Sequence, residues 1–338
     1  MINFQYARAN DVRDAVHQIA GDPNAKFVAG GTNLIDLMKM DVERPTKVID
    51  ITRLPLKQVE NMPNGGLRIG ALVRNTDLAY HPLVEERYPV LASAIMAGAS
   101  QQLRNMASTG GNLLQRTRCH YFYDVATPCN KREPGSGCSA IDGHNRMHAI
   151  LGSSEACIAT HPSDMCVALA ILEAKIHVSS ASGDRVIALA DFHRLPGDTP
   201  QRDTNLSAGE IITAVELPPK GFATNYTYLK IRDRLSYAFA LVSVAVGLEL
   251  DGDTIKEGRF ALGGVAHKPW RDPQAEAALR GQPANTTTFA RAADVLLRDA
   301  RGYAHNTFKI DFARRCIARA LTQAARGTPQ SQSSKKIV

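Results

Sequence analysis

The sequence predicts an α+β protein with a larger N-terminal part and a smaller C-terminal domain. Helix-like and strand-like segments alternate up to residue 217, and a Pro-Pro-Lys-Gly stretch at 218–221 has the composition of a linker. Three strand-like runs and then helices follow it. A length of 338 residues suits two or three domains. We therefore expect domains at 1–220 and 221–326, and a disordered polar tail at 327–338.

The elements follow from hydrophobic period and from punctuating residues. The helix at 11–19 places Val12, Ala15 and Val16 on one face, with Asn10 or Asp11 as its cap. The other N-terminal helices are expected at 34–40, 89–99 and 163–172, and the strands at 26–29, 48–51, 67–71, 175–179 and 210–217. The C-terminal strands are expected at 226–232, 240–250 and 259–265, with a turn at 251–253. The final helices are expected at 274–279, 289–298 and 306–326.

Charge and hydropathy exclude several classes of protein. The net charge is +7, but Lys and Arg are scattered and aromatic residues make up only 6%, so a nucleic-acid partner is disfavoured. A face for an acidic subunit, or a pocket for an anionic cofactor, explains the charge as well. The longest apolar run, 238–248, is too short to span a bilayer. The N-terminus lacks the pattern of a signal peptide, so we expect a soluble chain that is not exported on its own.

A glycine loop near the N-terminus has the chemistry of a phosphate site. The strand at 26–29 leads into Gly30 and Gly31, which lack Cβ and can adopt positive φ. A helix follows directly, so its dipole and free N–H groups face the same concavity. Thr32 and Asn33 add side-chain donors. The pattern is neither G-x-G-x-x-G nor a P-loop. The alternative is a tight turn with a helix N-cap.

A second glycine loop strengthens the phosphate interpretation. Ser108, Thr109, Gly110, Gly111 and Asn112 repeat the same chemistry about 80 residues later. We expect a second break in regular structure there. Two such loops can clamp one diphosphate from two sides.

Several short sequences together resemble the FAD-binding medium subunit of the xanthine dehydrogenase and aldehyde oxidoreductase family. They are AGGTNLIDL, STGGNLL, HPSDM, YLKIRDRLSYAFALVSVAV and ALGGVAHKPWR, and they extend over nearly the whole chain. The likeness is greatest to the flavin subunits of bacterial periplasmic aldehyde oxidoreductases. It implies a two-subdomain FAD-binding domain of the molybdenum hydroxylase flavoprotein type. A smaller C-terminal domain with a three-stranded antiparallel sheet and helices would follow.

The resemblance also implies the residues that bind FAD. The first loop would wrap the pyrophosphate with Lys26, Phe27, Val28, Ala29, Gly30, Gly31, Thr32, Asn33 and Leu34. The second loop would contribute Ser108, Thr109, Gly111 and Asn112. Asp164 would reach the ribityl chain, and Lys230 would stabilise the reduced flavin as a nearby cation. Without the resemblance, Asp164 reads as a helix N-terminal acid and Lys230 as a solvated strand lysine.

Four of the six cysteines fall in a segment, 115–159, that lacks any helix or strand period. Cys119, Cys129, Cys138 and Cys157 contain no C-x₂-C pair, which disfavours a zinc ribbon and a ferredoxin-type run. An irregular loop can still place four thiolates around a [4Fe–4S] cube. Two disulfides, a zinc site or unligated thiols are the alternatives. A long loop of this kind inside a compact domain is typically functional.

The segment resembles the cluster-bearing insertion of the 4-hydroxybenzoyl-CoA reductase flavin subunit, including its Thr-Arg-Cys run. This implies one [4Fe–4S] cluster with those four cysteines as ligands. Cys166 and Cys316 lie in helical apolar stretches, so we interpret them as packing thiols. The histidines of this region have no metal-site spacing and are interpreted as surface or packing residues. They are His120, His144, His148 and His161.

The function implied by the resemblance is electron transfer within a heterotrimer. A large subunit would oxidise an aldehyde at a molybdenum cofactor, and a small subunit would carry two [2Fe–2S] clusters. This chain would collect the electrons on FAD, and it would contain no catalytic acid or base. The closest resemblance implies export to the periplasm with a signal-bearing partner; the alternative is the cytoplasm. Two rival functions remain: the flavin subunit of a CoA-thioester reductase, and a zinc-containing nucleotide-binding scaffold protein.

Overall fold

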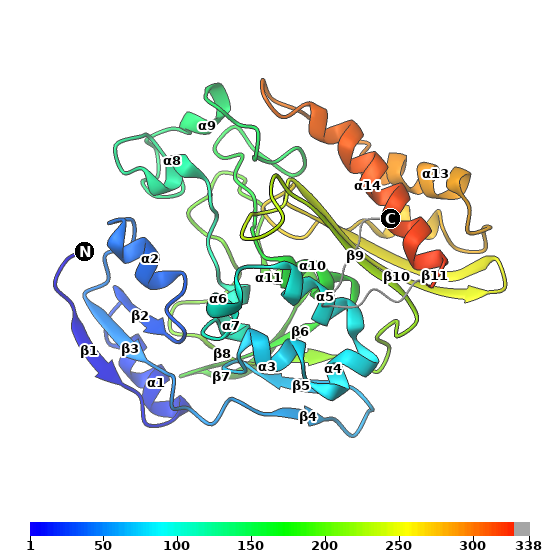
Figure 1. The fold of residues 1–338 in the computed structure, drawn as a ribbon. Helices are drawn as coiled ribbons and strands as arrows, with labels where there is room; N and C mark the ends of the chain where they lie inside the picture. Colours follow the sequence, from blue (N-terminus) through cyan, green and yellow to red (C-terminus); the bar gives the residue numbers. More distant parts are fainter. Residues whose placement is uncertain (328–338) are drawn as a thin grey trace.

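The structure, a computed structural model, describes residues 1–327 and has the expected α+β architecture, built on three sheets (Figure 1). The predicted tail lies outside the described residues apart from its first residue. The N-terminal sheet is parallel in the order β1-β3-β2, with strands Gln5–Arg8, Lys47–Asp50 and Ala25–Val28. Helices α1 (Val12–Ala20) and α2 (Leu34–Lys39) connect these strands. Asp11 caps α1 as predicted, because its side chain accepts a hydrogen bond from Asp14 N.

The second sheet has five antiparallel strands in the order β4-β5-β8-β6-β7. Their bounds are Val59–Asn61, Leu67–Gly70, Ile211–Leu217, Lys175–Ser180 and Gly183–Ala188. Helices α5 (Pro89–Ala97) and α10 (Asp164–Ile171) are apolar on all sides and almost wholly buried. Shorter helices complete this region: α3 (Asn75–Ala79), α4 (Pro82–Arg87), α6 (Gln101–Arg104), α7 (Thr109–Leu113) and α11 (Leu189–Phe192).

The C-terminal sheet is the predicted antiparallel one, in the order β11-β10-β9. Its strands are Thr254–Gly263, Val242–Asp251 and Asn225–Ile231. Helices α12 (Pro273–Ala277), α13 (Thr286–Leu296) and α14 (Phe308–Ala325) follow, and α14 packs across β9 and β10. The turn between β10 and β11 is where the sequence predicted it, with Gly252 at φ +55°.

Two faces of the C-terminal sheet explain how the domains join. Val242, Val244 and Val246 alternate along β10 and pack with α13 and α14. The intervening Ala245 belongs to the core that contains α5 and α10. The α5–α10 layer therefore shares a core with the five-stranded sheet and also packs against the C-terminal sheet.

Several sequence expectations need correction. The second glycine loop is not a break, because Gly110 and Gly111 lie inside α7. A Cβ at Gly110 would lie 3.1 Å from the Cβ of Ala71, so a larger residue there would crowd this contact. The segment 115–159 is mostly irregular but contains α8 (His120–Tyr123) and α9 (Ser139–Asp142). Strands β1, β4 and β7 were not predicted, and β11 begins five residues earlier than expected, at Thr254.

No helix within residues 1–327 combines the length and the apolar content needed to cross a bilayer.

Candidate functional site

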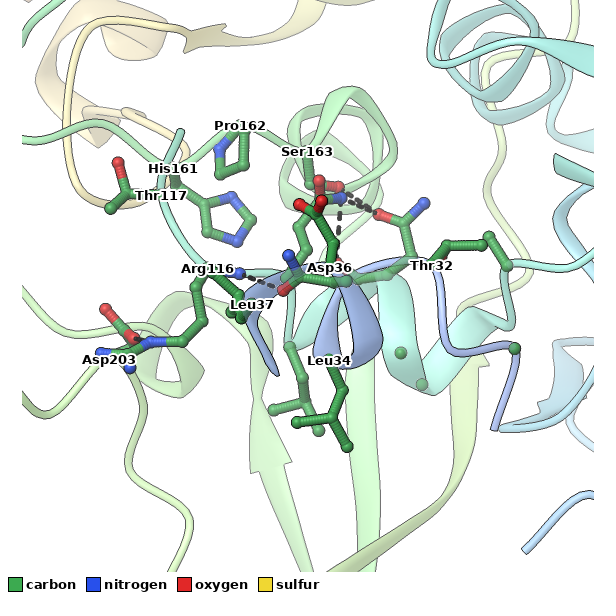
Figure 2. A pocket seen from close by; sticks show the side chains of 18 of the residues that line it. Thr32, Leu34, Asp36, Leu37, Arg116, Thr117, His161, Pro162, Ser163 and Asp203 are labelled. Carbon is green, nitrogen blue, oxygen red and sulfur yellow. Dashed lines mark hydrogen bonds and ion pairs between the residues drawn. The ribbon is translucent and has the colours of Figure 1, made fainter. Parts of the chain in front are cut away.

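A cavity of about 1240 Å³ lies where the N-terminal sheet, the second glycine loop and the start of α10 meet. It is large enough for a dinucleotide-sized ligand. Figure 2 shows part of its lining, with Thr32 and Leu34 from the first loop on one side and His161 and Ser163 on the other. The predicted residues Lys26 to Leu34, Ser108, Gly111, Asn112, Asp164 and Lys230 all line it.

The two glycine loops lie directly against each other. A Cβ added at Gly30 would lie only 1.9 Å from the carbonyl oxygen of Met106, just before the second loop. Gly31 has φ +71°, the left-handed region that glycine favours. A second contact lies just beyond the second loop, where Arg116 N donates to Oδ1 of Asn33 at 2.9 Å. The expected pairing of the loops around one cavity is therefore what the fold produces.

The first loop presents unused hydrogen-bond donors to the cavity. Within residues 1–327, the backbone N–H groups of residues 30–34 make no hydrogen bond. The Nδ2 of Asn33 is also buried without a partner, since its Oδ1 is the atom that binds Arg116 N. Buried donors rarely stay unpaired. This group of converging N–H donors at the start of α2 fits an anion such as a pyrophosphate.

The second loop contributes less than the sequence suggested. The backbone N–H groups of Thr109 and Gly110 donate to Val73 O and Ala71 O, and Gly111 N donates to Oγ of Ser108. Thr109 is fully buried and its hydroxyl donates to Val73 O, so it does not line the cavity. The predicted hydroxyl contact of Thr109 is not supported by this placement. The available groups of this loop are the side chains of Ser108 and Asn112.

Asp164 and Lys230 both reach the cavity, but they do so as an ion pair. Lys230 Nζ lies 2.8 Å from Oδ2 of Asp164 and also donates to Ala97 O. The phenol of Tyr228 donates to the other carboxylate oxygen at 2.6 Å. The alternative of a solvated strand lysine is therefore wrong, because the side chain of Lys230 is only 5% exposed.

Sequence reasoning missed a charged network on the opposite wall. Arg116 bonds both Asp203 and Glu43, and Lys131 bonds the second oxygen of Asp203 at 2.6 Å; Figure 2 shows the Arg116–Asp203 contact. Burial works against ionisation of Asp203. The charges of Lys131 and Arg116 outweigh it and hold the pKa of that carboxyl well below its usual range. The only signal in the sequence was the position of Arg116, directly after the second loop.

The segment 115–159, called the insertion below, contains four cysteines that line one small second cavity. They are Cys119, Cys129, Cys138 and Cys157. Cys129 and Cys138 lie opposite each other in an antiparallel bridge, and Cys138 shares a hydrogen bond with Cys157. All six cysteines lie in the described part of the chain and are free thiols, so the two-disulfide alternative does not match the structure. Four cysteines spread over residues 119–157 thus form a single sulfur-lined site.

The thiols differ in how readily they ionise. Burial raises the pKa of Cys119 to about 12, although the backbone N–H groups of Phe122 and Tyr121 act in the opposite direction. The hydrogen bond between Cys138 and Cys157 lowers the pKa of Cys138 to about 6 and raises that of Cys157. Four buried or partly buried thiolates without a cation would repel one another strongly. The site is therefore suited to thiolates only when a cationic centre balances them.

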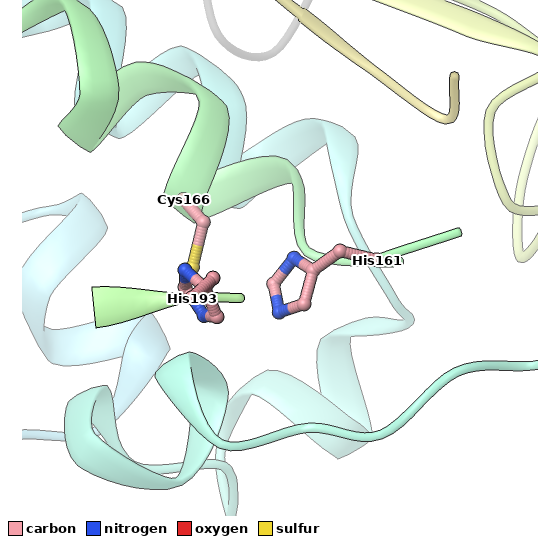
Figure 3. A group of neighbouring side chains, drawn as sticks. All are labelled: His161, Cys166 and His193. Carbon is pink, nitrogen blue, oxygen red and sulfur yellow. The ribbon is translucent and has the colours of Figure 1, made fainter. Parts of the chain in front are cut away.

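A third group of ligand-type side chains lies beside the large cavity. His161, Cys166 and His193 are buried, and their ligand atoms all lie within 4.8 Å of one another (Figure 3). Burial lowers the pKa of His193 to about 4 and that of His161 well below its usual value, and it raises the pKa of Cys166 to about 12. Two neutral rings and a protonated thiol result. The interpretation of Cys166 and His161 as packing residues stays a prediction.

Comparison with known proteins decides the family. The family model described as "FAD binding domain in molybdopterin dehydrogenase" matches residues 2–220, and "CO dehydrogenase flavoprotein C-terminal domain" matches residues 226–324. The chain belongs to the FAD-binding medium subunits of the molybdenum hydroxylases. It is 53% identical over 322 residues to the aldehyde oxidoreductase FAD-binding subunit PaoB of Escherichia coli, covering 95% of this chain and 98% of that protein.

More distant members of the molybdenum hydroxylase family share its fold. The glyceraldehyde dehydrogenase medium chain of Sulfolobus acidocaldarius is 32% identical, with 83% of each chain covered. The structure of CO dehydrogenase from Oligotropha carboxidovorans superposes with a TM-score of 0.75 at 20% identity, over 97% of this chain and all of that one. This likeness bears on the fold alone.

FAD fits the large cavity of this family member. The free N–H groups at 30–34 and the Asn33 amide would hold the pyrophosphate, and the cavity has room for the remainder of the dinucleotide. Gly30 leaves no space for a side chain between the two loops. FAD supplies the capacity to take up and release electrons at its isoalloxazine ring. The protein's part is to bind, orient and shield it.

Proposed function

We propose that this chain is the FAD-binding, electron-transferring subunit of a molybdenum aldehyde oxidoreductase. The observation that carries the proposal is the cavity between the two glycine loops, with its unused donors at residues 30–34. The kind of substrate is supported by the 53% identity to an aldehyde oxidoreductase subunit across almost the full length of both chains. We assign no catalytic acid or base to this chain. The aldehyde would be oxidised on the molybdenum-containing large subunit.

We further propose that Cys119, Cys129, Cys138 and Cys157 bind one [4Fe–4S] cluster. Support comes from the single cavity that the four sulfurs line and from their all-sulfur donor set. Backbone N–H groups of residues 121, 122, 140, 141, 158 and 159 lower the pKa of these thiols, which favours the thiolate form. The cluster would supply one-electron redox capacity, or it would brace a segment with little core of its own.

The partners in this proposal are a large molybdenum-cofactor subunit and a small subunit with two [2Fe–2S] clusters. Electrons would pass from the large subunit through the small one to FAD and then to an external acceptor. We also propose that the assembled complex works in the periplasm, exported in the folded state with a signal-bearing partner. Cell fractionation with an antibody to this chain tests that location; recovery in the cytoplasm alone would contradict it.

The decisive experiment is cofactor analysis of the co-purified complex, followed by substrate assays. We expect about one FAD for each copy of this chain, and about four iron atoms bound to it beyond those of the small subunit. Aldehydes should reduce the complex, while aromatic acyl-CoA thioesters should not accept electrons from it. A colourless protein with one zinc would instead favour the scaffold alternative. Turnover of acyl-CoA thioesters alone would favour the CoA-thioester reductase.

A further inference from the structure

Two buried histidines from distant parts of the chain touch two of the four clustered thiols. Nε2 of His148 lies 3.1 Å from Sγ of Cys119, and Nε2 of His267 lies 3.3 Å from Sγ of Cys157. His148 belongs to the insertion itself, whereas His267 follows β11 in the C-terminal domain. The two rings therefore approach the sulfur site from separate domains.

Both rings are shielded from water, being 3% and 8% exposed. A buried N–H group needs an acceptor. In His267, Nδ1 has no hydrogen-bond partner, so Cys157 is the acceptor within reach of this ring. A thiolate bound to iron carries no proton and can only accept, which places the ring proton on Nε2.

We propose that His148 and His267 donate N–H···S hydrogen bonds to Cys119 and Cys157 and thereby raise the reduction potential of the bound cluster. This inference rests on the proposed function, because it requires a cluster at the four cysteines. It assigns to both residues a positioning and tuning role, with neither ring acting as a ligand. The sequence interpretation had treated His148 as a surface or packing residue.

The physical reason is electrostatic. Reduction adds one electron to the cluster, and part of the added negative charge spreads onto the cysteine sulfurs. A hydrogen-bond donor aimed at a sulfur therefore stabilises the reduced state more than the oxidised state. The low local dielectric of a buried site strengthens this preference. Backbone N–H groups act in the same sense, but the two imidazoles are the donors that a substitution can remove.

One lysine holds both histidine segments in place. The Nζ of Lys309, from α14, donates to His148 O at 2.8 Å and to Gly264 O at 2.6 Å. Gly264 has φ +74° and begins the turn that carries His267. The rings are thus fixed relative to each other by contacts that do not involve the cysteines. Such fixed second contacts are what keep a donor aligned with its sulfur.

The test is a low-temperature EPR redox titration of the purified complex. His148→Phe and His267→Phe should each lower the midpoint potential of this cluster. The expected shift corresponds to about a tenfold change in the redox equilibrium, or about 59 mV for one electron. His267→Gln keeps an N–H donor and should shift the potential less than His267→Phe. His177→Gln is the control, because His177 lies on β6 and bonds Arg68 and Glu216.

The outcomes separate this inference from the proposed function. Wild-type protein without iron at these cysteines overturns the proposed cluster. Variants that keep four iron atoms and the wild-type potential overturn the tuning role alone. For variants that fail to fold, wild-type protein containing ¹⁵N-labelled histidine gives a second measurement. Pulsed EPR of its reduced cluster should then detect hyperfine coupling to histidine nitrogen, and its absence would overturn the inference.

Discussion

The ammonium group of Lys230 lies 2.8 Å from a carboxylate oxygen of Asp164, and the two side chains are 5% and 9% exposed. Tyr228 bonds the other oxygen of the same carboxylate. The large cavity therefore contains a neutralised ion pair in place of a free cation. Any influence of Lys230 on bound FAD is shared with Asp164.

Replacing Asp164 by Asn should destabilise the protein by about 3–5 kcal/mol, because it leaves the charge of Lys230 buried without a counterion. Flavin content should fall with it, since both residues line the cavity. Adding Lys230→Met should recover part of the lost stability. Thermal unfolding and flavin absorbance measure both effects. Asp294→Asn, in the exposed pair with Arg314, is the matched control and should cost less than about 1 kcal/mol; equal losses would contradict our account.

Gly30→Ala should separate the two glycine loops, since its Cβ would meet the carbonyl oxygen of Met106 at 1.9 Å. We expect FAD affinity to fall at least tenfold, or about 1.4 kcal/mol. Gly21→Ala serves as the control. There a Cβ meets only ordinary contacts, 3.8 Å from Gln18 O, and φ is −78°. Equilibrium dialysis of flavin-depleted protein measures the difference. Unchanged affinity in Gly30→Ala would show that the loops do not grip the cofactor together.

Cys138→Ser should remove most of the iron bound to this chain, because one corner of the proposed cluster loses its thiolate. Cys166→Ser and Cys316→Ser should leave the iron content unchanged. These two thiols are buried in α10 and α14, away from the other four. Iron analysis and visible absorbance of the purified complexes report the result. Full iron in Cys138→Ser, or iron loss in both control variants, would refute the assignment of ligands.

Lys309 should make stability depend on pH in the alkaline range. Burial lowers the pKa of Lys309 from 10.5 to about 7, so between these values the unfolded chain binds a proton that the folded chain does not. The contribution of Lys309 to the free energy of unfolding therefore rises with pH from about 7 to 10.5. Below pH 7 the folded chain carries the buried charge, and the full cost of burying it is present. Unfolding of wild type and Lys309→Met at pH 7, 8 and 9 measures it. The difference between their free energies of unfolding should change by a few kcal/mol in favour of wild type as the pH rises from 7 to 9.

The control for this comparison is Lys256→Met, because Lys256 is 55% exposed in its pair with Asp251. Its difference from wild type should stay constant over the same pH range. A constant difference for Lys309→Met as well would mean that Lys309 stays protonated in the folded protein.

Local signals in the sequence were enough for the elements that carry a strong period or a cap. Asp11 and the apolar face at Val12, Ala15 and Val16 give α1 to within a residue, and alternating valines give β10. The short strands β1, β4 and β7 escaped prediction. Each has only three to six residues and contains exposed positions, so these segments become strands through pairing with neighbouring strands and not through a local pattern.

The candidate site was predictable only in part, for a related reason. Gly30 and Asn33 could be recognised because their chemistry is encoded by neighbours in sequence. The ion pair of Lys230 could not be predicted because its partner, Asp164, lies 66 residues away. Thr109 was misassigned because the use of its hydroxyl by Val73 O depends on tertiary packing. His267 carried no local signal at all, since its contact with Cys157 joins two domains.

The insertion is held in place by residues of the C-terminal domain, which are synthesised much later. Ile150 and Leu151 both donate to Val265 O, and Arg301 donates to Ile150 O. A ribosome will have released nearly the whole polypeptide before these anchors exist. The proposed cluster would accordingly be inserted into a nearly complete chain, and a product truncated before residue 265 would lack these anchors.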